Sequence, residues 1–297
     1  MLREIADLGF DRVELSHGIR IALVPGILKA AEDGIVKIGS THNFCPLPMG
    51  VLQAAPNFFQ PSSADGRERE QWTRQTKRSI DFASQVGASV LVCHLGSVRY
   101  LWLKPDRHME AYLGTHPEAV KTGDKAYVAM AEKALLKIRG RMAPYWERTR
   151  ESVRSVLDYA AEKNIRLGLE NRESFEELPL DADFPELLAG MPAPAPAGYW
   201  HDSGHAHLKE GMGLINHRRQ LEANANRLLG FHLHDVDSEG RDHQAIGSGG
   251  IDFEMVSSFW RPGHLFIIEL SPRVPVEGVL ASKARVDALL AKLGPLG

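Results

Sequence analysis

Short apolar runs rich in β-branched residues alternate with longer amphipathic stretches along the whole chain. This alternation is typical of repeated βα units around a parallel sheet. Seven apolar runs are predicted to be strands, at residues 12–16, 35–44, 89–96, 165–171, 198–205, 228–235 and 265–271. Residues 2–8, 72–86 and 148–162 carry the helical pattern, and Gly9 and Gly87 stand where two helices should stop. The predicted fold is an α/β barrel of the (β/α)8 TIM type.

The barrel pattern has two irregular parts. A barrel of this type needs eight strands, but the chain opens on a helix, so the first strand is missing or is replaced by an atypical element. An unfilled gap would expose two sheet edges. Residues 99–145 are too long for a simple βα connection, and this inserted segment either acts as a lid or packs beside the barrel. Since α/β barrels of this length form one unit, we expect residues 1–297 to be a single domain.

The composition is that of an ordinary globular protein, with 43% hydrophobic and 25% charged residues. A net charge of -3 offers no general attraction to nucleic acid or to anionic lipid, so the expected partner is a small molecule. Neither a signal peptide nor a run long enough to cross a membrane is visible. The two cysteines, Cys45 and Cys93, suit a reducing compartment, and a cytoplasmic location is expected.

Polar residues end four consecutive predicted strands. Glu170, Asp202 and Glu269 each end an apolar run, and His232 and His234 lie near the end of another. In a parallel barrel the functional residues lie at the C-terminal ends of the strands, so these side chains should meet at one mouth. The two histidines are two positions apart on a strand and therefore share a face, so one can be the ligand and the other can support it or contact the substrate. Carboxylates gathered in this way repel one another unless protons or a cation compensate them.

A divalent cation is the simplest compensation. Three carboxylates and one imidazole suit Mn, Co, Mg or Zn without selecting among them. A salt bridge inside the barrel would explain Glu170 alone equally well, but four such residues on successive strand ends favour a metal site. His205 stands three residues after Asp202 and would lie one helical turn beyond it. It is a second ligand, a substrate contact, or a histidine bonded to a loop carbonyl.

The chain resembles the xylose isomerase-like TIM-barrel superfamily, also described as AP endonuclease family 2. This group includes sugar phosphate isomerases and epimerases such as D-tagatose 3-epimerase and hydroxypyruvate isomerase, and also inosose dehydratase and endonuclease IV. The resemblance rests on the order and spacing of LEN (169–171), HDSGHA (201–206), HLHD (232–235), DHQAIGSGGID (242–252) and IIEL (267–270). It extends from the run RVELS to the last strand, and no single motif is decisive.

The resemblance implies a ligand set for one divalent ion. The implied ligands are Glu170, Asp202, His232 and Glu269. His232 is preferred to His234 because it stands three residues before Asp235, as in the HLxD pattern of the family. His205 matches a histidine that contacts substrate in the epimerases and metal in endonuclease IV.

Four further residues are substrate-binding candidates by the same resemblance or by position. His94 resembles the histidine of the family's HPG motif, although Leu95 replaces the proline. His243 resembles a metal-binding residue of endonuclease IV, and a structural role is equally open for both histidines. Arg172 and Arg273 would hold a substrate hydroxyl, carboxylate or phosphate, or would be structural.

The implied activity is that of a divalent-metal-dependent sugar (phosphate) isomerase or epimerase. Glu170 and Glu269 would be the catalytic residues, one removing the proton next to a carbonyl and the other returning it through a metal-stabilised enediolate. The expected partner is a small carbohydrate or polyol, and the resemblance is compatible with a homo-oligomer.

Other activities remain open on the same residues. The first is a keto-polyol dehydratase or lyase. The second is an endonuclease IV-like apurinic-site endonuclease, for which His94, His205 and His243 would supply further metal ligands. The net negative charge and the lack of a clustered basic stripe count against that activity. The third is a barrel that binds a sugar without turning it over.

Overall fold

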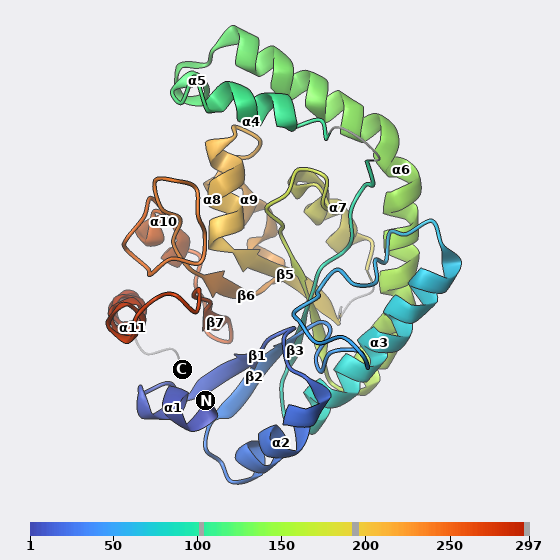
Figure 1. Ribbon diagram of the computed structural model, residues 1–297, viewed down its shortest axis with the longest axis vertical. Coiled ribbons are helices and arrows are strands. Elements are labelled where there is room, and N and C mark those ends of the chain that lie inside the picture. The colour runs from blue at the N-terminus through green and yellow to red at the C-terminus, as the bar shows by residue number, and fades with distance from the viewer. Residues whose placement is uncertain (101–103, 192–195, 294–297) are drawn as a thin grey trace.

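The computed structural model describes residues 1–100, 104–191 and 196–293. Seven parallel strands form one sheet in sequence order, and the sheet curls into a nearly closed barrel with helices outside it (Figure 1). The strands are β1 (Arg12–Leu15), β2 (Lys37–His42), β3 (Val90–Cys93), β4 (Arg166–Glu170), β5 (Ala197–Asp202), β6 (Leu228–Leu233) and β7 (Leu265–Ile268). Each lies within, or one residue beyond, a strand predicted from the sequence. The predicted fold class is therefore confirmed.

The barrel is open between its first and last strands. Within the described residues β1 pairs only with β2, and β7 pairs only with β6. The expected absence of one barrel strand is thus confirmed. A groove of about 460 Å³ lies between the two unpaired edges, and Phe10, Val13 and Phe266 are among its lining residues. Helix α1 (Leu2–Asp7) and helix α11 (Val276–Lys292) flank this groove.

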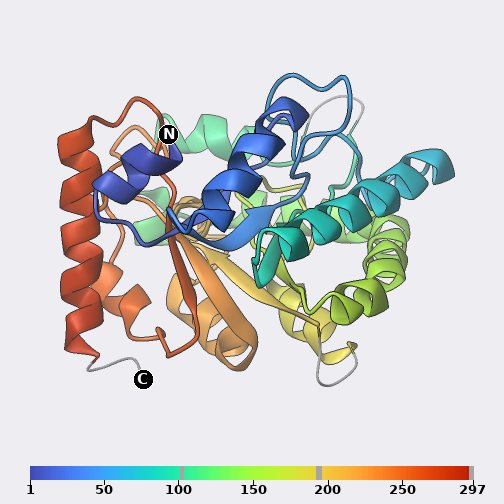
Figure 2. The same cartoon turned by 90° about the horizontal axis from the view of Figure 1, so that it is seen from below.

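Most of the other helices surround the strands (Figures 1 and 2). They are α2 (Val24–Glu32), α3 (Gly66–Gln85), α6 (Lys125–Glu162), α7 (Phe184–Ala189), α8 (Ser203–Gly211), α9 (His217–Asn224) and α10 (Phe253–Ser257), with single turns at Ile21–Leu23, Asp181–Asp183 and Ala225–Arg227. The predicted helix 72–86 is the main part of α3, and 148–162 is the last part of α6. None of the helices in the described ranges has both the length and the apolar character needed to cross a membrane.

The predicted insertion forms α4 (Arg107–Leu113), α5 (Ala119–Thr122) and the first half of α6. Residues 101–103 of this segment lie outside the described part of the chain. Met109, Tyr127 and Ile138 of the insertion belong to a second hydrophobic cluster, which they share with Phe175 and Leu178 of the loop after β4. The Tyr127 hydroxyl donates a hydrogen bond of 2.6 Å to the carbonyl of Met212, directly after α8. This bond fastens the insertion to the helix that follows Asp202.

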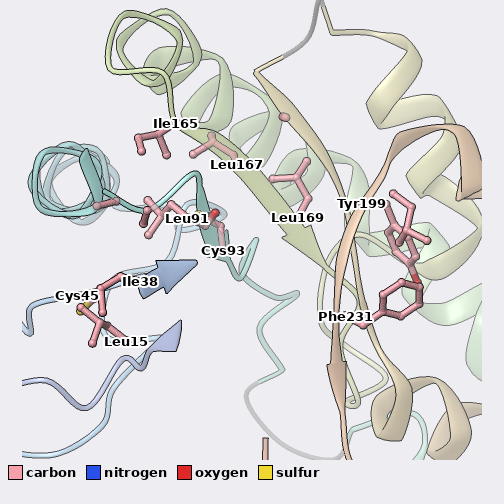
Figure 3. Packing of buried hydrophobic residues seen from close by; sticks show 14 of the residues in the cluster. Leu15, Ile38, Cys45, Leu91, Cys93, Ile165, Leu167, Leu169, Tyr199 and Phe231 are labelled. Carbon is pink, nitrogen blue, oxygen red and sulfur yellow. Dashed lines mark hydrogen bonds between the residues drawn. The ribbon is translucent and has the colours of Figure 1, made fainter. Parts of the chain in front are cut away.

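Successive side chains of each strand point alternately out of and into the barrel, and this alternation separates two hydrophobic cores. Leu91, Leu167, Leu169 and Phe231 face the surrounding helices and belong to the main hydrophobic core (Figure 3). The intervening positions point into the barrel, where Trp200 packs with a few aliphatic side chains. A Cβ atom on Gly230 would lie 2.5 Å from the Trp200 ring, so glycine is needed there. Trp200 and its neighbours close the lower barrel, and the inward positions above them form the site.

Candidate functional site

The structure brings the four predicted ligands together at the C-terminal ends of β4 to β7. Nδ1 of His232 lies 3.0 Å from Oε1 of Glu170 and 3.1 Å from Oε2 of Glu269. The same nitrogen is 3.9 Å from Oδ2 of Asp202. Three of these side chains are buried, whereas that of Glu269 is 30% exposed. Glu269 therefore forms the open side of the cluster.

A fifth residue, Glu14 on β1, fixes the orientation of His232. Oε1 of Glu14 lies 2.9 Å from Nε2 of His232, and its Oε2 accepts a 2.6 Å hydrogen bond from the Ser40 hydroxyl. Because a carboxylate can only accept, Nε2 of the histidine carries a proton and donates it to Glu14. A neutral His232 then turns the lone pair of Nδ1 toward the three carboxylates. Sequence reasoning missed Glu14, although it lies near the end of a predicted strand.

The negative charges of the three carboxylates in this cluster have to be balanced by a positive charge. Burial disfavours the ionised form of Asp202, but His205 and His234 outweigh burial and hold its pKa below the usual value. Burial also opposes ionisation of Glu269, yet His232 and His243 lower the pKa of that carboxyl. Burial alone would lower the pKa of His232, and the carboxylates Glu269 and Glu14 instead raise it well above the usual value. A second proton on His232 or a divalent cation beside Nδ1 would balance these carboxylates, and the donor set suits such a cation.

His234 supports this cluster from behind. Its Nδ1 accepts a 2.9 Å hydrogen bond from the backbone N–H of His243, and its Nε2 lies 3.0 Å from Oδ2 of Asp202. Since a backbone N–H can only donate, the proton of a neutral His234 sits on Nε2 and is donated to Asp202. Both ring nitrogens are therefore engaged. This geometry favours His232 over His234 as the ligand.

His205 lies on the first turn of α8, which Asp202 caps. Oδ1 of Asp202 accepts a 2.8 Å hydrogen bond from the backbone N–H of His205. Nδ1 of His205 lies 3.0 Å from the carbonyl of Asn171, so this nitrogen donates and Nε2 is left available. The bond to a loop carbonyl, one of three roles considered from the sequence, is thus present. His205, Glu173 and Asp242 also form a small group whose spacing fits a cation.

His42 and His94 face the other oxygen of Glu170. Their Nε2 atoms lie 3.4 Å and 3.0 Å from Oε2 of Glu170. Their Nδ1 atoms contact the carbonyl of Asn43 and the side-chain oxygen of Asn57, both at 3.0 Å. Neutral rings oriented in this way direct two more lone pairs at the carboxylate, so this group can also hold a cation. His94 was singled out from the sequence, whereas only its place at the end of a strand marked His42.

The two predicted arginines lie in different surroundings. Arg172 is buried, with Nη1 at 3.2 Å from Glu170 Oε2 and Nε at 3.2 Å from Glu177 Oε1. Burial opposes ionisation of Glu170, but Arg172 together with His232, His42 and His94 outweighs burial and holds the pKa of that carboxyl well below its usual value. Arg273 is exposed on the loop after β7 and lines a wide pocket at the mouth of the site.

His243 borders the same pocket beside Glu269. Its Nδ1 is 3.0 Å from Asp242, its Nε2 is 3.7 Å from Glu269, and its ring stacks on His234 at 4.2 Å between centroids. Burial would lower the pKa of His243, but Asp242 and Glu269 raise it to about 10. His243 therefore places a positive charge at the rim of the carboxylate cluster.

Comparison with known proteins gives a family and a set of similar folds. The family model described as xylose isomerase-like TIM barrel matches residues 2–273. Sequence comparison with curated proteins finds no match. A D-tagatose 3-epimerase-like protein superposes with a TM-score of 0.68 at 18% identity, over 97% of this chain and 91% of its own. 3-Keto-D-glucoside 4-epimerase from E. coli superposes with a TM-score of 0.64 at 15% identity, over 97% of this chain and 92% of its own. L-ribulose 3-epimerase superposes with a TM-score of 0.65 at 14% identity, over 97% of this chain and 86% of its own. At these identities the likeness shows the fold.

Proposed function

The chain belongs to the xylose isomerase-like TIM-barrel family, and from that premise we propose that it is a divalent-metal-dependent sugar isomerase or epimerase. One observation carries the proposal. The Nδ1 atom of His232 faces Glu170, Asp202 and Glu269, while its other nitrogen is held by Glu14. An imidazole aimed at three carboxylates is an arrangement typical of a bound divalent ion. The epimerases among the structurally similar chains support the same reading.

His232 and the three carboxylates around its Nδ1 atom would hold the ion. When bound, a divalent cation supplies Lewis acidity that polarises a substrate carbonyl and stabilises negative charge on its oxygen. Glu14 would orient His232 by accepting a hydrogen bond from its Nε2. His234 would orient Asp202 by donating a hydrogen bond to its Oδ2. The metal could be Mn, Co, Mg or Zn.

Glu170 and Glu269 would move the proton. Both carboxylates lie within 3.1 Å of His232 Nδ1. Glu170 ends β4 and Glu269 directly follows β7, and these strands lie on different sides of β6 in the sheet. One would take a proton from the carbon next to the carbonyl, and the other would return a proton to the opposite face. Both carboxyl groups have lowered pKa values, although burial opposes this, so each is ionised and able to accept a proton.

Proton exchange with solvent tests this proposal directly. The protein, loaded with Mn²⁺ or Co²⁺, is incubated in D₂O with a panel of ketoses, and deuterium at the carbon next to the carbonyl is followed by NMR. We expect incorporation into at least one sugar and none after the metal is removed with a chelator. A metal-loaded protein that exchanges no proton of any ketose would refute the proposal.

The same site could eliminate water or cleave a bond after the same proton removal. A hydroxyl on the next carbon would then leave, and the product would be an unsaturated or shorter carbonyl compound rather than an epimer. Mass spectrometry of the exchange reactions distinguishes these products.

The additional histidine groups give some support to a phosphodiesterase. The group of His42, His94 and Glu170 and the group of Glu173, His205 and Asp242 offer further cation sites beside the first. The net charge of -3 opposes binding to DNA. Cleavage of a duplex that contains an abasic site would favour this second candidate.

A further inference from the structure

The gap in the barrel leaves β1 and β7 with one partner each in the described residues (Figure 1). Every strand between them pairs on both sides, and β3, β5 and β6 are buried along their whole length. In β7, by contrast, Phe266, Ile267 and Ile268 are only half-buried, although all three are apolar. Continuous apolar runs are typical of parallel strands in the interior of a sheet. The composition of β7 is therefore that of an interior strand, whereas its position is that of an edge.

The free edge of β7 presents backbone hydrogen-bonding groups to the gap. The N–H of Glu269 donates a 3.1 Å hydrogen bond to the C=O of Leu233 on β6. Successive residues of a strand direct their backbone groups to opposite edges, so those of Phe266 and Ile268 point away from β6. Both residues thus offer an N–H donor and a C=O acceptor to the gap.

The free edge of β1 does the same from the other side. The C=O of Asp11 accepts a 3.0 Å hydrogen bond from the N–H of Lys37, the first residue of β2. Arg12 follows Asp11 and therefore directs its own N–H and C=O away from β2, toward the gap. Arg12 and Phe266 both line the groove of about 460 Å³, so hydrogen-bonding edges border it on two sides.

The walls of this groove are mostly apolar. Val13 lines it from β1, Ile5 and Leu8 line it from α1 and its end, and Val286 lines it from α11. Burial of this surface would drive association with an apolar occupant. The same burial would be costly for the backbone groups of the two edges unless the occupant provides hydrogen-bond partners for them.

An extended polypeptide meets both requirements. A helix uses its backbone groups internally, and a small organic molecule does not match the alternating N–H and C=O groups of two strands. We propose that the groove binds an extended segment of a partner protein as a β-strand that runs parallel to β1 and β7. This strand continues, on both of its sides, the parallel ladder that joins the other strands.

The two edges also indicate the length and charge of the segment. Each edge strand has four residues, so about five residues of the partner would lie in the groove. Glu14 lines the groove, and Leu270, which follows Glu269, lines both the groove and the wide pocket at the mouth of the site. The carboxyl end of a parallel strand lies at this mouth, where the two carboxylates attract a Lys or Arg side chain.

A synthetic peptide with these properties tests the inference. The probe is the hexapeptide Val-Thr-Val-Ile-Val-Lys with an N-terminal fluorophore and a C-terminal amide. We expect saturable binding of one peptide per chain by fluorescence anisotropy. The backbone amides of Arg12, Phe266 and Ile268 should exchange with D₂O about tenfold more slowly in the complex, as NMR can measure, because ladder hydrogen bonds protect them.

Two further peptides separate strand pairing from apolar contact. The first has the same side chains but carries N-methyl groups on alternate residues, so it cannot donate hydrogen bonds to one edge. We expect it to bind about tenfold more weakly. The second has its Lys at the amino end and should also bind more weakly, because in a parallel strand this end lies far from Glu14.

A variant removes one hydrogen-bond donor of the edge itself. Arg12→Pro lacks the N–H that faces the gap, and proline is tolerated on edge strands, so peptide affinity should fall about tenfold. Arg12→Val keeps this N–H and is the matched control. If Arg12→Pro does not fold by circular dichroism, the N-methylated peptide still decides, since it leaves the protein unchanged.

Three results would overturn the inference. Equal binding of the parent and N-methylated peptides would mean that the groove is only an apolar cleft. Slow exchange of the Phe266 and Ile268 amides without peptide, together with a dimer in analytical ultracentrifugation, would mean that a second copy of this chain covers the edges. Failure of the parent peptide to bind, or tighter binding of the peptide with its Lys at the amino end, would exclude the parallel strand.

Discussion

The Glu14 carboxylate lies 2.9 Å from Nε2 of His232, although 218 positions separate the two residues in the chain. The contact runs across the barrel from β1 to β6, so it exists only once the sheet has curled. Its effect is to place the proton of His232 on Nε2 and to direct Nδ1 at the other carboxylates.

Replacing Glu14 by Gln should therefore weaken cation binding without removing a ligand. The amide keeps the size of the side chain but lacks its charge, and it can present an N–H group to Nε2 instead of an acceptor. We expect the affinity for Mn²⁺ to fall about 10- to 100-fold, the usual cost of losing such a supporting contact. Isothermal titration of the metal-free protein measures this change. Glu32→Gln, at an exposed position on α2, is the control, and equal affinities for both variants would contradict the assigned role.

Substituting the two neighbouring histidines should have unequal effects. His232→Gln removes the nitrogen that faces three carboxylates, whereas His234→Gln disturbs the hydrogen bonds to Asp202 and to the backbone N–H of His243 and removes no proposed ligand. We expect the first variant to lose stoichiometric Mn²⁺ binding and the second to lose about 10- to 100-fold in affinity. Titration of both variants under identical conditions decides the matter. A larger loss in His234→Gln would make His234 the ligand.

The strands and the main carboxylates could be predicted from the sequence for one physical reason. In a parallel barrel every strand ends at the same face, so the polar residue after each apolar run lands near its counterparts. This reasoning placed Glu170, Asp202 and Glu269 together without any knowledge of distances. The unpaired edge beside β1 was also predictable, because the pattern contained seven strands rather than eight.

The remaining features depend on contacts that chain spacing does not encode. His42 approaches Glu170 only because β2 and β4 belong to the same curled sheet. The tautomer of His232 depends on Glu14. Glu14 belongs to the predicted strand 12–16, in which no other residue was a candidate ligand or catalytic group. Arg172 is held at Glu170 by Glu177, a loop residue five positions later. Such partners become visible only in three dimensions.

Glu170→Gln and Glu269→Gln should both lose solvent exchange of the substrate proton. An amide cannot accept a proton from carbon, and loss of a positioned base costs about 10²- to 10⁴-fold in rate. Metal content is measured on the same samples, because a variant that still binds Mn²⁺ but exchanges no proton has lost the base rather than the ion. Exchange at the wild-type rate in both variants would rule out the two-glutamate mechanism.

Acid should destabilise the metal-free protein in part through His217, which lies away from the carboxylate cluster. Nε2 of His217 is 2.9 Å from Nε2 of His201, so one nitrogen donates and the other accepts, and an added proton would break this bond. Burial, with a smaller contribution from His207, lowers the pKa of His217 to about 4 from 6.5. Between these values the unfolded chain binds the proton and the folded chain does not, so stability falls as the pH falls.

The lowered pKa of His217 corresponds to about 3 kcal/mol of unfolding free energy, lost progressively as the pH falls from 6.5 to 4. His217→Gln has no titrating group at this position, so its unfolding free energy should decline less steeply over the same range. The difference in slope corresponds to the uptake of up to one proton on unfolding. Urea denaturation of the chelator-treated protein at several pH values measures the slope. His116→Gln, at an exposed site on the insertion, should keep the wild-type slope. An unchanged slope in His217→Gln would mean that the buried histidine pair accepts a proton in the folded state, for example by rotating apart.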